Sequence, residues 1–180
     1  MAIDDKKWAE IQAKWKAASE TKPVKAEFKK DLARGHDGER SFYEKYQGSV
    51  THLDGRNADF EINKTAETIE LKTDYYDYEK TANFFMERYS YAEEPGGVWQ
   101  AAKKGITYFI YHFDSHDVTF IFNTKQLVRR LEKLEPTLKL VQVQNKNYIT
   151  RGYKVPIVLL SEMCLEPADI NLHEPKRKKK

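Results

Sequence analysis

The chain has 180 residues, of which 40% are apolar and 33% are charged, so it is long enough to bury the core of one globular domain. It lacks both a run of about 18 apolar residues and the apolar segment of a signal peptide. This excludes a membrane-spanning protein, and we expect a cytoplasmic one (in the host cytoplasm if the source is viral). The single cysteine, Cys164, excludes an intramolecular disulfide and a multi-cysteine zinc site.

The positive charge is concentrated at the C-terminus. The formal net charge is +3, but residues 176–180 are all Lys or Arg, and without them the chain has 26 basic and 28 acidic residues. Attraction for nucleic acid would therefore depend on this tail and on local patches, although a solubilising end explains such a tail equally well. We accordingly divide the chain into an N-terminal helix or arm (1–22), one domain (23–165) and a basic tail (166–180).

The first predicted element is an amphipathic helix over residues 4–20. Trp8, Ile11 and Trp15 recur at i, i+3 and i+7, which is the spacing of one helix face. Such a stripe most often packs into a core or against a second copy of the chain. The helix could therefore serve as the arm of a homodimer.

A second helix is predicted to begin at an N-cap, Asp37, and to run to about residue 47. Phe42 and Tyr46 lie four residues apart and would form its buried face. Glu39 falls in the first turn, where an acid is favoured by the helix dipole alone. A catalytic role for Glu39 therefore needs support from elsewhere in the chain.

A hairpin follows, after a first strand over residues 49–53. Residues 57–62 and 68–73 both alternate apolar and polar side chains, which is typical of half-buried strands. If residues 63–66 form a four-residue turn, Asp59 faces Glu70 at ~5 Å between their Cβ atoms. Their charges would repel by roughly 3 kcal/mol at an effective dielectric constant of ~20, which a divalent cation would relieve. An ordinary solvated strand face is the alternative interpretation.

The later elements alternate between strands, helices and turns. Residues 73–80 are predicted to be a loop in which Tyr75 and Tyr76 stack on bases or simply cover the surface. Further strands are predicted over residues 83–90, 106–113, 118–122, 138–143 and 152–160, the last an edge strand because it contains Pro156. Helices are predicted over residues 98–104, ended by Gly105, and 124–134, capped by Thr124. The order predicts an α/β fold with a mixed central sheet and flanking helices on both faces.

Other catalytic patterns are absent from the sequence or weak. Gly96 and Gly97 are not followed by the Lys-Ser/Thr of a nucleotide-binding loop. His112 and His116 fall across a strand end and a turn, which disfavours a zinc pair. Cys164 lies in an apolar stretch and is interpreted as a buried filler rather than a nucleophile. The hairpin therefore carries most of the functional inference.

The order of Asp59 and then Glu70-Leu71-Lys72 resembles the PD-(D/E)xK nuclease superfamily, whose fold is called restriction-endonuclease-like. In that superfamily a carboxylate on one strand and an acid-x-Lys on the next form the active site of a metal-dependent nuclease. The resemblance covers about residues 30–113, and Glu39 matches an additional upstream acid of many members. Ala58 stands where the superfamily often has proline.

The wider pattern looks like that of small phage-type and bacterial members of the superfamily. The matching positions are Gly35, Gly38, Glu39, Asn83, Glu87, Pro95, Gly96, Gly97 and Trp99. The resemblance implies that Asp59 and Glu70 bind Mg²⁺, with the Leu71 carbonyl and Glu39 as further ligands and Mn²⁺ as an expected substitute. It implies that Lys72 orients the attacking water or stabilises charge on the phosphate. Candidate DNA contacts are Asn83, Glu87, Tyr75, Tyr76, Lys103 and Lys104.

The expected function is thus a metal-dependent DNA endonuclease for recombination, repair or restriction. Its substrate stays open between duplex and branched DNA, including the four-way junctions of Holliday-junction resolvases, because no base-reading element is recognisable. One rival is a non-catalytic nucleic-acid-binding or partner-binding module on the same fold. Another is a structural or inhibitory factor that grips a partner through the Trp8–Trp15 helix.

Overall fold

The computed structural model describes residues 24–25, 28–53, 57–90, 93–144 and 148–175. The expected helix over residues 4–20 and the basic residues 176–180 lie outside the described residues. Within them, no helix is long and apolar enough to cross a membrane.

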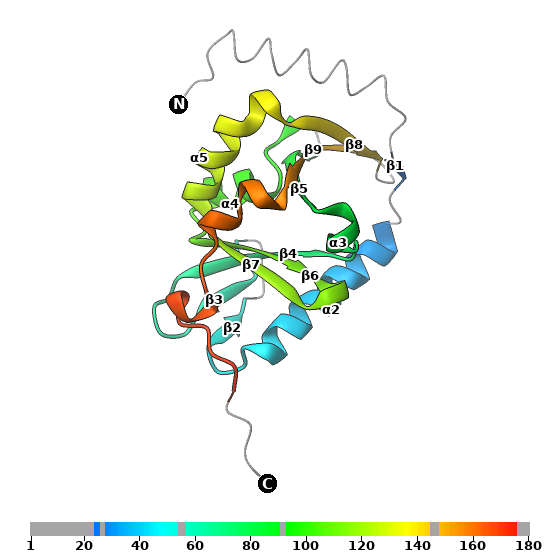
Figure 1. The fold of residues 1–180 in the computed structure, drawn as a ribbon. Coiled ribbons are helices and arrows are strands. Elements are labelled where there is room, and N and C mark those ends of the chain that lie inside the picture. The colour runs from blue at the N-terminus through cyan, green and yellow to red at the C-terminus, as the bar shows by residue number, and fades with distance from the viewer. Residues whose placement is uncertain (1–23, 26–27, 54–56, 91–92, 145–147, 176–180) are drawn as a thin grey trace.

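The strands form two sheets, and the predicted mixed α/β fold is confirmed (Figure 1). The five-stranded sheet has the order β2 (Val50–His52), β3 (Phe60–Ile62), β4 (Thr68–Asp74), β6 (Tyr108–Phe113) and β7 (Val118–Asn123). Its β4 and β6 are parallel and its other pairs are antiparallel. The second sheet has the order β1 (Val24–Lys25), β8 (Lys139–Gln144), β9 (Ile149–Pro156) and β5 (Asn83–Tyr89). The strands are thus divided between two sheets rather than gathered into one.

Helices flank the five-stranded sheet. The α-helices are α2 (Phe28–Lys45), α3 (Tyr78–Thr81), α4 (Gly97–Lys104) and α5 (Thr124–Leu134). Short 3-10 turns are η2 (Asp114–His116), η3 (Glu135–Thr137), η4 (Ile157–Leu159), η5 (Ser161–Met163) and η6 (Pro167–Ile170). Figure 1 shows α2 beside the five-stranded sheet, with α4, α5 and the second sheet gathered at the other side.

Two buried clusters fill the opposite faces of the five-stranded sheet. Along β6, Phe109 and Tyr111 belong to the first core, with side chains of α4, α5 and the second sheet. Ile110, between them, belongs to the second core, with Phe42 and Tyr46 of α2. Because successive strand residues point to opposite faces, this alternation places α2 across the sheet from α4.

The start of α2 differs from the prediction, because the helix begins at Phe28 and Asp37 lies inside it rather than at an N-cap. Gly38 is a buried helical residue. A Cβ atom at Gly38 would lie 2.1 Å from Oγ1 of Thr73 on β4, so the glycine lets helix and strand approach closely. The expected burial of Phe42 and Tyr46 is confirmed.

Two further predictions are corrected by neighbouring contacts. Strand β9 lies between β8 and β5 and is not an edge, and Pro156 is tolerated because it is the last residue of the strand. Helix α5 is capped by Asn123 rather than Thr124, since the Asn123 side chain accepts a hydrogen bond from the Gln126 N–H (3.2 Å).

Packed structure continues past the boundary expected at residue 166. Ile170 and Leu172 are both 2% exposed and belong to the second core. Leu165 also bridges to Ile121 of β7. Residues 166–172 are therefore part of the packed domain, which the polar composition around these apolar side chains concealed.

A buried ion pair ties the second sheet to η3 and α4. Nε of Arg88 lies 2.9 Å from Oε1 of Glu135, and both side chains are less than 10% exposed. The Tyr153 hydroxyl donates to the same carboxylate oxygen (3.1 Å). The Arg88 guanidinium stacks on the rings of Tyr89 (4.6 Å) and Trp99 (4.8 Å).

We expect Arg88→Met to lower the free energy of unfolding by about 3–5 kcal/mol, because it leaves the Glu135 charge buried without its partner. The double variant Arg88→Met/Glu135→Leu should recover part of this loss, since both charges are then removed. Urea denaturation of the three variants, including Glu135→Leu alone, measures the coupling. Additive losses would contradict a paired role.

The glycines of α2 give a matched pair of substitutions. Gly38→Ala should lower the free energy of unfolding by about 1–3 kcal/mol, because the new methyl group meets Thr73. Gly35→Ala should leave it unchanged or raise it by up to about 1 kcal/mol, because a Cβ there meets nothing within 4 Å and alanine favours the helix. Equal stabilities for the two variants in urea denaturation would contradict the close approach of α2 to β4.

Candidate active site

The predicted hairpin register is confirmed, but its end is irregular. Phe60 pairs with Ile69 and Glu61 with Thr68, and the Ile62 N–H bonds to the Glu67 carbonyl (2.8 Å) across the expected four-residue turn. Strand β3 begins only at Phe60, so Asp59 lies in a bend before the ladder rather than in a strand.

The bend directs the Asp59 carboxylate at the next strand. The Asp59 N–H bonds to the Ile69 carbonyl (3.0 Å), and its Oδ2 accepts a hydrogen bond from the Leu71 N–H (2.7 Å). A side-chain oxygen thus takes the place of a backbone acceptor beside Glu70. Short, charge-assisted bonds of this kind are stronger than neutral ones, so Asp59 is fixed on the strand that carries the second acid.

Burial and like charge act together on the two acids. Burial raises the pKa of Glu70 to about 7, with further increases from the charges of Asp59 and Glu39 and an opposing effect of Lys104. Burial also raises the pKa of Asp59, against the lowering effect of the Leu71 hydrogen bond. The acids are therefore held close together at an electrostatic cost that a cation would offset.

Glu39 reaches this site from α2. Its Oε2 lies 3.3 Å from Nε2 of His52 on β2 and 3.9 Å from Nδ1 of His36. Its charge raises the pKa of both Asp59 and Glu70, so the three acids act on one another. Glu39 thus lies near the hairpin acids, where the approach of α2 at Gly38 brings it, and its role as a metal ligand stays a prediction.

A cleft beside Asp59 contains residues that the sequence analysis missed. Its lining consists of His36, Glu39, Arg40, Tyr43, His52, Leu53 and Asp59. The four residues from α2 stand at i, i+3, i+4 and i+7, which is one helix face. That spacing was visible in the sequence and was missed because the helix was predicted to start at Asp37.

Lys72 has surroundings different from those the motif predicts. Its side chain is exposed on β4, and its charge acts on Glu87 of β5, where it partly offsets the rise in pKa that burial causes. The described lysine whose charge lowers the pKa of both Asp59 and Glu70 is Lys104, in the last turn of α4. The predicted role of Lys72 stays a prediction.

The candidate DNA contacts fall into different surroundings. Asn83 bonds through its amide group to the carbonyl of Thr81 and thereby fixes the chain after α3. Tyr76 is 67% exposed and Tyr75 is half-buried, and both follow the C-terminal end of β4. Lys103 pairs with Glu94 (3.7 Å) at the surface. The roles of these residues in DNA binding therefore stay predictions.

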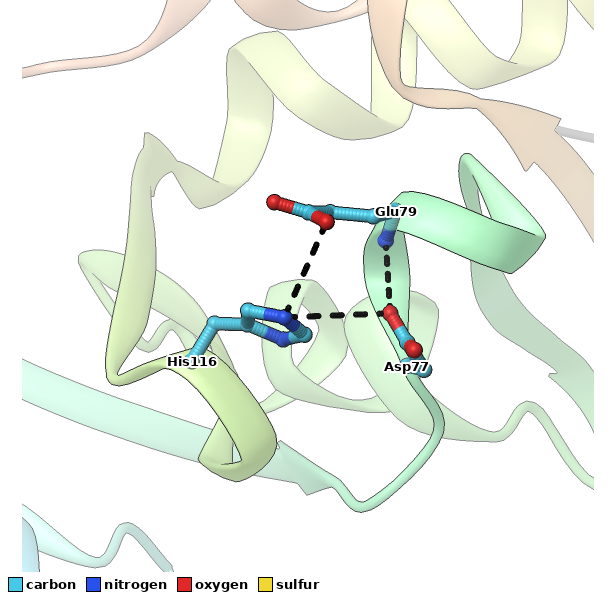
Figure 2. Close-up of side chains that lie close together, drawn as sticks. All are labelled: Asp77, Glu79 and His116. Atoms are coloured by element: carbon cyan, nitrogen blue, oxygen red, sulfur yellow. Dashed lines mark hydrogen bonds and ion pairs between the residues drawn. The ribbon is translucent and has the colours of Figure 1, made fainter.

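A separate group of potential metal ligands lies at the surface (Figure 2). The ligand atoms of Asp77, Glu79 and His116 lie within 4.8 Å of one another. Among the described residues, this is the group of three potential metal ligands that lie so close together. Figure 2 shows the His116 ring directed at both carboxylates. Asp77 caps α3 through the Glu79 N–H (3.1 Å) and pairs with Lys80 (3.1 Å), so helix capping already explains its position.

The two hairpin acids, Asp59 and Glu70, repel each other when both are ionised, and a hard divalent cation bound between them would remove this repulsion. Carboxylate oxygens are the ligands that Mg²⁺ prefers, and a half-buried acid whose pKa is raised by burial and by neighbouring acids favours a bound cation. Asp59, Glu70 and Glu39 would hold it, and the Leu71 carbonyl stays a predicted ligand. No family model matches this chain, and no curated protein is similar enough in sequence to count as a relative.

We expect Glu70→Gln to raise the free energy of unfolding at pH 8 by roughly 1–3 kcal/mol without divalent cations. The pKa of Glu70 rises from its ordinary 4.5 to about 7 on folding, so the folded state prefers the protonated acid. Its contribution to stability is present below pH 4.5 and is lost as the pH rises through 7. Denaturation at pH 4 and pH 8 checks the sign.

The same samples test metal binding. Mg²⁺ should raise the melting temperature of the unmodified protein at pH 8 and should have a smaller effect on Glu70→Gln. An equal Mg²⁺ effect on both proteins would contradict a cation at Glu70.

Proposed function

We propose that the protein is a metal-dependent DNA endonuclease that hydrolyses phosphodiester bonds. The observation that carries the proposal is the pair of half-buried acids, Asp59 and Glu70, fixed beside each other by the Leu71 hydrogen bond. Glu39 and Lys104 add a third acid and a cation to the same place. The resemblance of the hairpin to the PD-(D/E)xK superfamily points to the same activity.

The residues of the site divide into two roles. Asp59, Glu70 and Glu39 bind Mg²⁺ or Mn²⁺. The bound cation lowers the raised pKa values of Asp59 and Glu70, so these two acids are ionised in the active state. The bound cation would polarise the phosphate and acidify a water molecule. Lysine ammonium groups next to the acids stabilise the negative charge that develops on the phosphate. The expected products are a 5′-phosphate and a 3′-hydroxyl.

The substrate class is DNA, either duplex or branched, and the cleft beside Asp59 is where the chain adjoining the cleaved phosphate would lie. Arg40 and Tyr43 line this cleft and offer a charge and a ring to that strand. A homodimer is part of the proposal, because two sites at a fixed distance would suit double-strand or four-way-junction cleavage.

The first experiment is cleavage of supercoiled plasmid with Mg²⁺, with Mn²⁺ and with chelator. Asp59→Asn and Glu70→Gln should each lower the rate by at least about 100-fold, because each removes charge that holds the cation. Glu61→Gln is the matched control, since this acid lies on the same hairpin in the pair with Thr68. Full activity in Glu70→Gln would overturn the proposed site.

A panel of linear, single-stranded, flapped and four-way-junction DNAs then identifies the substrate. A non-catalytic nucleic-acid-binding module makes two different predictions. The protein would bind DNA with equal affinity in Mg²⁺ and in chelator, and Glu70→Gln would change neither binding nor cleavage. These results together would favour that module over the nuclease. Size-exclusion chromatography of the full chain measures the homodimer separately.

A further inference from the structure

The two lysines at the end of α4 have different surroundings although they are adjacent in sequence. Lys103 lies 3.7 Å from Glu94, whereas Lys104 forms no ion pair with a described residue. Helix α4 ends at Lys104, and Gly105, with φ of 80°, turns the chain toward β6. The end of α4 at Lys104 is therefore held at a defined point of the fold, and its ammonium group forms no ion pair with a described acid.

The packing places this point beside the hairpin acids. The Thr107 N–H bonds to Oγ1 of Thr68 (3.4 Å), so the chain after α4 is attached at the start of β4. Glu70 pairs in register with Phe109, which belongs to the first core together with Ala101 of α4. Because Ile69 points into the second core, Glu70 points to the face of the sheet that α4 covers.

The charges are consistent with this placement. The positive charge of Lys104 lowers the pKa of both Asp59 and Glu70, the two acids from the two strands of the hairpin. The charge of Lys72, the lysine of the sequence motif, acts on Glu87 instead. Lys104 thus supplies the positive charge next to the two acids that the sequence motif led us to expect from Lys72.

We propose that Lys104 is the cation that contacts the phosphate at the Asp59–Glu70 site, a role that rests on the proposed nuclease function. Its ammonium group stays protonated throughout and transfers no proton. It donates hydrogen bonds to a non-bridging phosphate oxygen and stabilises the charge gained when water attacks phosphorus and the bond to the 3′-oxygen breaks. The charge of Lys72 acts instead on Glu87 of β5.

The test compares Lys104→Ala, Lys104→Arg and Lys72→Ala with Lys103→Ala, which removes the same charge one residue away. Cleavage of the best DNA substrate should fall about 100-fold in Lys104→Ala and less in Lys104→Arg. It should fall far less in Lys103→Ala, because the charge of this candidate phosphate contact is already paired with Glu94. Calorimetric titration with Mg²⁺ alone supplies a readout that needs no activity. Lys104→Ala should bind Mg²⁺ about three- to tenfold more tightly, because a cation next to the acids is gone.

Opposite changes, slower cleavage with tighter Mg²⁺ binding, support the proposal, because structural damage would weaken both. If the unmodified protein cleaves DNA and Lys104→Ala matches Lys103→Ala in both assays, the role of Lys104 is overturned while the nuclease stands. If the unmodified protein cleaves no DNA, the nuclease function is overturned, and the Mg²⁺ titration still shows whether Lys104 acts on the acids.

Discussion

Repulsion between half-buried carboxylates is the constraint on which the site depends. If their side chains were free, the carboxylates of Asp59 and Glu70 would move apart into water. Asp59 is instead held by a hydrogen bond from the Leu71 N–H, on the strand that carries Glu70. Its carboxylate replaces a ladder acceptor, so moving it away would leave a backbone donor unsatisfied. The ladder between β3 and β4 therefore holds two like charges together, and burial, followed by the charge of Asp59, raises the pKa of Glu70.

The third acid depends on a different contact, the close approach of α2 to β4. Gly38 lies against Thr73, three residues after Glu70, and Glu39 follows directly in the helix. A larger residue at position 38 would move the helix outward and carry Glu39 away from His52 and the hairpin. Two features of the backbone thus position the acids. The register of β3 and β4 places Asp59 and Glu70, and the close contact of Gly38 with β4 places Glu39.

The sequence predicted those parts of the site that rest on local patterns. Alternation along residues 57–73 was enough for the hairpin register, because a shift of one residue would expose Phe60 and Ile69. The predicted start of α2 was wrong because Asp37 resembles an N-cap, whereas the helix begins at Phe28 and continues through Gly35. The place of His52 in the cleft and the different surroundings of Lys103 and Lys104 depend on packing between distant segments, which no local pattern encodes.

The residues after β5 show how a motif can carry structure rather than chemistry. A Cβ atom at Gly96 would lie 2.6 Å from Cγ of Glu87, so this glycine makes room for the acid at the start of α4. Gly97 has a φ of 47°, which favours glycine, and Trp99 stacks under the buried Arg88 guanidinium.

Together the residues from Gly96 to Trp99 fix the start of α4 against β5. An eight-residue helix fixed at its start by a half-buried acid, Glu87, and a buried cation, Arg88, has little freedom at its other end, where Lys104 lies. The placement of Lys104 beside the hairpin acids therefore depends on contacts made by residues that need not touch a substrate at all.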